Sequence, residues 1–161
     1  MRDPKASSYI IIGSLENTGT FKITEGMRSK LVDFWSDFAT DKQTIESIRD
    51  VYQNHGYLID THTAVAYFVY KKYLGKTQDK TKTILASTAS PFKFPHSVAR
   101  AIQGQGFKNN LDEFQFMDRL SALTGLPVPK PLKDIGNKKI LHNRFCKKEE
   151  MKDVVAEILK V

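Results

Sequence analysis

The amino-acid sequence predicts an α/β fold in which mostly helices surround a small sheet. Five segments show helical periodicity, whereas a single run, Lys82–Thr88, has the composition of a buried strand. This run ends on a cluster of hydroxyl side chains formed by Ser87, Thr88 and Ser90. Open α/β sheets bind their ligands beside the carboxyl ends of such strands. We therefore expect the functional site at this end of the strand.

The first third of the sequence predicts helices after a poorly assigned start. Within residues 1–20, the isoleucine-rich run Tyr9–Ile12 is followed by a glycine, which is typical of a strand. Apolar residues recur at helical spacing over Met27–Phe38 and predict a helix with a buried aromatic stripe. The next helix is expected to begin at a capping box that starts with Thr40, and Gly56 is expected to end it.

The helix that precedes the strand is expected from about Thr61 to Leu74, with Asp60 or Thr61 as its N-cap and Gly75 as its stop. The side chains near its start are small, as at Thr63. Small side chains allow either close packing of a helix on a sheet or the approach of a flat ligand ring. The residues by themselves favour close packing, and both alternatives stay open.

The second half of the sequence predicts three further helices. They are expected at Pro95–Gln103 with Gly104 and Gly106 as its stops, from a cap at Asn110 and Glu113 to a stop at Gly125, and over Met151–Leu159. The last segment carries apolar residues at i, i+3, i+4 and i+7, so it predicts an amphipathic docking helix. Pro127–Pro131 cannot continue a helix and predicts an extended surface connection.

The composition limits the classes of protein and partner. The 161 residues, 40% of them apolar, suffice for a single domain over 1–161. The net charge of +7 leaves open a free-standing basic α/β module that binds an acidic partner or nucleic acid. The lysines alternate with acidic residues, so solvated faces and no nucleic acid are the main expectation. No apolar run is long enough for a membrane span, and the N-terminal residues do not resemble a signal peptide.

The cysteine and histidines predict neither a disulfide framework nor a metal site. The chain has one cysteine, Cys146, and four histidines without metal-ligand spacing. A single cysteine suits a reducing compartment, so the expected location is cytoplasmic.

Two motifs in fixed order carry a resemblance to a known family. The sequence IDTHTAVAY, at Ile59–Tyr67, is followed some twenty residues later by STASPFKF, at Ser87–Phe94. Together they resemble the C-terminal part of threonine synthase, a pyridoxal-phosphate enzyme. The likeness continues through FATDKQTIESIRDVY before them, and through LSALTGLPVPKPLK and FCKKEEMKDVVAEIL after them. It covers roughly Gly19 to the end of the chain.

The resemblance implies a piece of an enzyme. The implied fold is a mostly helical part of the tryptophan-synthase-β-like fold (fold type II), with a small partial sheet. The implied activity is that of a lyase that converts O-phospho-L-homoserine and water to L-threonine and phosphate. The region of the Schiff-base lysine has no counterpart here, so we expect no catalytic residue in this chain and no activity of the chain alone. The implied partners are the missing N-terminal part and O-phosphohomoserine as substrate. Sheet edges cut from their neighbours also predict self-association.

The resemblance places one wall of the pyridoxal-phosphate pocket in this chain. Thr88 occupies the position of a hydroxyl that hydrogen-bonds the pyridine nitrogen, which tunes the ring without the ion pair that an aspartate would give. Ser87, Asp60, His62 and Thr63 are expected to line the same crevice. The residues by themselves give Ser87 and Thr88 a simpler role, as hydroxyls that cap helices or close turns.

Overall fold

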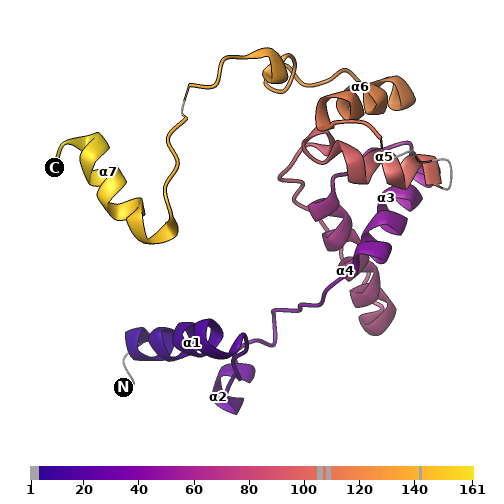
Figure 1. The fold of residues 1–161 in the computed structure, drawn as a ribbon. Coiled ribbons are helices and arrows are strands. Elements are labelled where there is room, and N and C mark those ends of the chain that lie inside the picture. Colours follow the sequence, from indigo (N-terminus) through magenta and orange to yellow (C-terminus); the bar gives the residue numbers. More distant parts are fainter. Residues whose placement is uncertain (1–3, 105–106, 108–109, 142) are drawn as a thin grey trace. The chain divides into compact units, whose positions relative to one another are not determined.

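The computed structural model describes residues 4–104, 107, 110–141 and 143–161. These residues form helices joined by irregular segments, and no strand occurs among them. The chain falls into two compact units, Met1–Ala89 and Ser90–Val161. The first unit holds α1 (Pro4–Thr18), α2 (Glu25–Arg28), α3 (Asp41–His55) and α4 (Thr61–Thr77) (Figure 1). The second holds η1 (Pro91–Lys93), α5 (Pro95–Gln103), α6 (Glu113–Thr124), η3 (Ile135–Asn137), η4 (Lys148–Glu150) and α7 (Met151–Leu159). The mostly helical character predicted from the sequence is confirmed.

Helices α3 and α4 pack together in the first unit. The predicted capping box at the start of α3 is confirmed: the Thr40 amide donates to Gln43 Oε1 at 2.8 Å, and the Gln43 amide donates to Thr40 Oγ1 at 3.3 Å. Gly56 ends the helix at a φ of 64°, as expected. The two helices and their connection bury an apolar core that consists of Ile48, Val51, Leu58, Ile59 and Ala64.

The predicted strand at Tyr9–Ile12 is wrong, because these residues lie inside α1. Isoleucine runs favour strands only weakly, and this run has good helix formers on both sides, such as Ala6 and Leu15. A strand would also need a neighbouring strand to take its hydrogen bonds, whereas a helix satisfies its backbone internally. The Gly19 amide donates to the Leu15 carbonyl at 2.9 Å and closes this helix.

The predicted helix over Met27–Phe38 is also wrong, because α2 ends at Arg28. The Asp37 side chain accepts a hydrogen bond from the Phe38 amide at 2.8 Å, and such local bonds compete with a helix. Contacts with α4 hold the segment instead. Trp35 packs edge-on against Tyr73 with ring centroids 5.6 Å apart, and Lys72 forms an ion pair with Asp37 at 2.6 Å.

Helix α4 passes through Gly75 and ends two residues later, so the predicted stop at Gly75 is wrong. Gln78 takes the left-handed conformation with a φ of 56°, and its amide donates to the Leu74 carbonyl at 2.9 Å. Asp79 then closes a turn by accepting hydrogen bonds from the Tyr73 hydroxyl at 2.7 Å and the Thr81 amide at 2.9 Å. This turn leads the chain into the segment from residue 82.

The predicted core strand, Lys82–Thr88, has no regular secondary structure, and Ile84 is 94% exposed. The physical reason is that a strand needs a neighbour for its backbone hydrogen bonds. None of the described residues supplies such a neighbour. The composition therefore correctly predicts that the segment is apolar. The prediction that it is buried is wrong for this chain.

The second unit is built on the packing of α5 against α6. Val98, Ala99 and Ala101 of α5 are fully buried, as is Leu120 of α6. Helix α5 has the predicted bounds and ends at Gly104, while Gly106, the second predicted stop, lies outside the described residues.

The start of α6 differs from the sequence prediction. Asp112 is the N-cap and forms a capping box with Gln115, in place of Asn110 and Glu113. The predicted stop at Gly125 is confirmed, with a φ of 70°.

The C-terminal helix α7 forms as predicted and exposes its apolar face. Met151 is 56% exposed, Val155 52%, Ile158 60% and Leu159 64%. None of the described helices is both long and apolar enough to cross a membrane.

Candidate functional site

A buried carboxylate organises the start of α4. Asp60 is the N-cap of this helix and is 0% exposed. Its Oδ1 accepts hydrogen bonds from the His62 amide at 2.8 Å and from the Thr63 amide at 3.4 Å. Aspartate is favoured at this position because its side chain pairs with amides that have no partner inside the helix.

A chain of hydrogen bonds joins this helix start to the hydroxyl cluster 24 residues further on. The Thr63 hydroxyl contacts Asp60 Oδ2, and Thr63 Oγ1 lies 3.0 Å from Ser87 Oγ. Thr63 is buried, whereas Ser87 is exposed. This chain of hydrogen bonds joins three of the five residues that the sequence predicts for the site.

His62 also contacts the buried carboxylate. Its Nδ1 lies 3.3 Å from Asp60 Oδ1, while the imidazole side chain is 64% exposed. A carboxylate beside one ring nitrogen favours the tautomer that carries its proton there, and it directs the other nitrogen away. Asp60 thus orients the His62 ring toward the surface.

The environment of Asp60 favours its charged form. Burial raises the pKa of this carboxyl, but hydrogen bonds from the Thr63 hydroxyl, the two amides and His62 outweigh burial, so the pKa lies below its usual value of 3.8. Asp60 is therefore an acceptor of hydrogen bonds at neutral pH. The groups around it all supply donors to it.

Thr88 lies next to this chain of hydrogen bonds and is not part of it. Its side chain is exposed, and the described hydrogen bonds of the site run from Asp60 through Thr63 to Ser87. Thr88, the fifth predicted residue, thus directly follows Ser87, whose side chain contacts Thr63. An exposed hydroxyl of this kind is a neutral donor that a ligand atom can reach.

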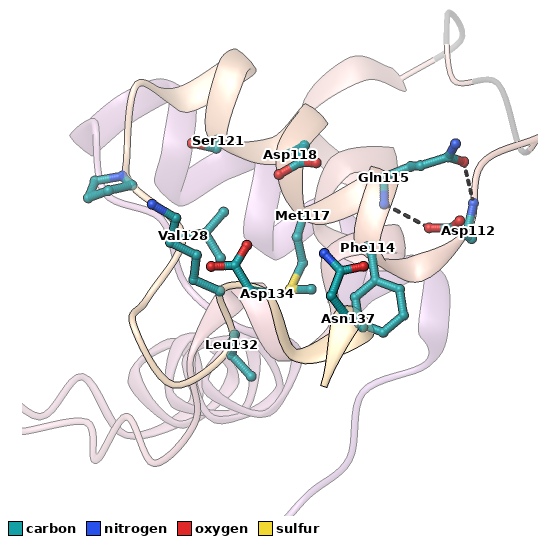
Figure 2. A pocket seen from close by; sticks show the side chains of 13 residues that line it. Asp112, Phe114, Gln115, Met117, Asp118, Ser121, Val128, Leu132, Asp134 and Asn137 are labelled. Atoms are coloured by element: carbon teal, nitrogen blue, oxygen red, sulfur yellow. Dashed lines mark hydrogen bonds between the residues drawn. The ribbon is translucent and has the colours of Figure 1, made fainter. Parts of the chain in front are cut away.

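A second candidate site lies in the second unit and was missed by sequence reasoning. A cavity of about 590 Å³ lies between α6 and residues 127–137. Figure 2 shows its carboxylates, Asp112, Asp118 and Asp134, and its apolar side chains, which include Met117, Val128 and Leu132. The predicted surface connection at residues 127–131 contributes to the wall. The sequence pattern that could have predicted this cavity is the polar face of α6, which comes directly before the proline-rich segment.

Comparison with known families covers most of both candidate sites, because the matched range includes the cavity residues between 112 and 137 as well as Thr63, Ser87 and Thr88. A family model described as threonine synthase, C-terminal, matches residues 63–146, just over half of the chain. The chain belongs to this family. The matched residues include Thr63, Ser87 and Thr88, whereas Asp60 and His62 lie just before them. The resemblance of the two sequence motifs to threonine synthase is thereby confirmed.

Individual relatives agree with the family match. The chain is 39% identical over 71 residues to threonine synthase of Schizosaccharomyces pombe, which covers 44% of this chain and 14% of the relative. It is 30% identical over 96 residues to threonine synthase of Saccharomyces cerevisiae, covering 56% and 19%. It is 33% identical over 95 residues to human threonine synthase-like 1, covering 58% and 12%. The chain thus spans less than a fifth of the length of these threonine synthase relatives.

Proposed function

We propose that this chain is the C-terminal part of a threonine synthase that converts O-phospho-L-homoserine and water to L-threonine and phosphate. The observation that carries the proposal is the family match over 63–146, which contains the hydroxyl pair of Ser87 and Thr88. The much greater length of the relatives named threonine synthase supports a longer enzyme with a further N-terminal part. Threonine biosynthesis from this substrate suits a cytoplasmic enzyme.

The proposed fold of the whole enzyme is fold type II, with 1–161 as a single domain at its C-terminal end. In that fold Lys82–Thr88 is a strand whose neighbours come from the N-terminal part. The exposure of Ile84, at 94%, supports this proposal, because an apolar side chain in an unpaired segment gains stability when a sheet covers it.

The residues at the start of α4 and at residues 87–88 fit pyridoxal phosphate. When bound, pyridoxal phosphate supplies an electron-withdrawing ring that stabilises negative charge on the substrate carbon. Thr88 would donate a hydrogen bond to the pyridine nitrogen, and a neutral donor suits that atom when no carboxylate is offered. Asp60, His62, Thr63 and Ser87 complete this wall of the pocket. The lysine that reacts with the cofactor belongs to the N-terminal part, so the chain alone is inactive.

The alternative of a basic module for nucleic acid gains no support from α4. Lys71 lies 3.2 Å from Asp50, and Lys72 lies 2.6 Å from Asp37. These ion pairs neutralise two of the cations that a phosphate backbone would need. The enzyme proposal remains the one that the described residues favour.

The proposal is tested by extending the reading frame upstream and expressing the full-length protein. Purified protein is supplied with pyridoxal phosphate and O-phospho-L-homoserine, and phosphate and threonine are measured together. We expect equal amounts of both products from the full-length protein and neither from the chain alone. A full-length protein that holds the cofactor and releases no threonine would refute the proposed reaction.

A further inference from the structure

The hydroxyl groups of Thr63 and Ser87 link two segments that are far apart in the sequence. Thr63 belongs to the first turn of α4, and Ser87 lies near the end of the irregular segment that runs from the turn at Asp79 to η1. Their oxygens are 3.0 Å apart, and Thr63 is 5% exposed. The end of the irregular segment is therefore attached to the buried part of the first unit by a side-chain contact.

The chemistry of the three groups determines the direction of the bonds. A hydroxyl has a single proton to donate and two lone pairs that accept. Asp60, as a carboxylate surrounded by donors, accepts only, so the Thr63 proton points to Asp60 Oδ2. The proton between Thr63 and Ser87 must then come from Ser87. Once Ser87 donates to Thr63, it has no second proton for a ligand.

We infer that Asp60 and Thr63 are positioning residues that make Ser87 an anchor and leave Thr88 as the hydroxyl donor of the pair. The part that concerns the cofactor rests on the proposed function. Two adjacent hydroxyls could otherwise compete for one acceptor atom on the ligand. Because the Ser87 hydroxyl is bonded to Thr63, the backbone at Thr88 is fixed. The Thr88 hydroxyl is then the one of the two that can donate to the ligand.

The anchor is tested first on the 161-residue chain, without cofactor. Backbone ¹⁵N order parameters of Ser87 and Thr88 are measured in the parent, in Thr63→Val and in Thr63→Ser. In the parent we expect about 0.85, the value of rigid backbone, and in Thr63→Val below about 0.6. Thr63→Ser keeps the hydroxyl and should restore the rigid value. The carboxyl pKa of Asp60, followed by ¹³C NMR, should rise in Thr63→Val. Burial raises this pKa, and the variant lacks the Thr63 hydroxyl, whose hydrogen bond lowers it.

Two further variants separate the anchor from a general loss of stability. Thr44→Val changes another buried threonine, whose hydroxyl bonds within α3 to the Thr40 carbonyl at 3.0 Å, and it should leave Ser87 and Thr88 rigid. Ser87→Ala removes an exposed side chain, so it should fold. It should loosen Thr88 while leaving the Asp60 pKa close to the parent value. Equal rigidity of Thr88 in the parent, Thr63→Val and Ser87→Ala would overturn the inference.

The role of Ser87 is tested next in the full-length protein loaded with pyridoxal phosphate. A misplaced donor costs turnover, so Ser87→Ala should lower kcat about threefold to tenfold and leave KM nearly unchanged. Thr88→Val should have the larger effect. A larger loss in Ser87→Ala than in Thr88→Val would make Ser87 the donor and refute the assignment. The order parameters do not depend on the cofactor, so a failure of the proposed function and a failure of the anchor give different results.

Discussion

Replacement of Asp60 by alanine should lower the free energy of unfolding of the first unit by about 2 kcal/mol. Loss of an N-cap costs about 0.5–2 kcal/mol, and Asp60 caps α4 through two amides. A hydrogen bond to a charged group, such as the one from Thr63, contributes about 1.5–3 kcal/mol. The sum is reduced because the variant no longer buries a carboxylate, and because the Thr63 hydroxyl keeps Ser87 as a partner.

The assay is urea unfolding followed by tryptophan fluorescence. Trp35 is the single tryptophan of the chain and packs against Tyr73 of α4, so it reports on the first unit. Asp60→Asn retains one side-chain acceptor for the amides and should cost less, about 1 kcal/mol. A free energy of unfolding for Asp60→Ala within about 0.5 kcal/mol of the parent would refute this energetic role of Asp60.

The same carboxyl should make the stability of the first unit depend on pH. The pKa of Asp60 is lower in the folded chain than its usual value of 3.8. The folded state therefore binds the proton less readily than the unfolded state. Its contribution is complete above the unfolded pKa and is lost as the pH falls below about 4 through the folded pKa. Asp60→Asn should remove this part of the pH dependence.

Three other predictions follow from single features of the chain. Gly56→Ala should destabilise α3 by about 1 kcal/mol, because Gly56 has a φ of 64° and the added methyl meets no atom within 4 Å, so only backbone strain acts. The matched change Gly75→Ala lies inside α4, where the added methyl also meets no atom within 4 Å. It should stabilise the first unit by about 0.5–1 kcal/mol in the same urea assay. Light scattering should show association of the chain at high concentration, because Ile84 and the apolar face of α7 are exposed, and a strictly monomeric chain would contradict this. Incubation with pyridoxal phosphate and borohydride should not label the exposed Lys93 specifically, and stoichiometric labelling there would place the lysine chemistry in this chain.

Sequence patterns predicted several helix ends that are determined by local hydrogen bonds, although the start of α6 and the end of α4 differ from the prediction. The capping box of Thr40 and Gln43 and the left-handed glycine at Gly56 set α3 as expected, and Gly125 ends α6 as expected. These features act within one turn of the chain, so they can be identified without knowledge of the tertiary structure. The same holds for the start of α4, where the sequence predicts Asp60 or Thr61 as the N-cap and Asp60 takes that role.

Patterns that depend on distant partners were predicted less well. The aromatic stripe of Met27–Phe38 packs in part against α4 through Trp35 instead of forming its own helix. The strand prediction for Lys82–Thr88 presupposed neighbours that none of the described residues provides. The contact between Thr63 and Ser87 spans 24 residues, and spacing alone could not reveal it. The motif resemblance placed both residues at one site, and the structure adds the bond that connects them.

The central claim is that Thr88 supplies a donor to the pyridine nitrogen, and turnover of the full-length Thr88→Val variant tests it most directly. Thr88→Ser keeps the hydroxyl and serves as the matched control. The loss of a neutral donor in a dry site is worth roughly 1.4–3 kcal/mol, so Thr88→Val should lower kcat about 10- to 100-fold while cofactor binding persists. Thr88→Ser should retain most of the parent activity. Parent-like turnover of a folded, cofactor-loaded Thr88→Val enzyme would contradict the claim.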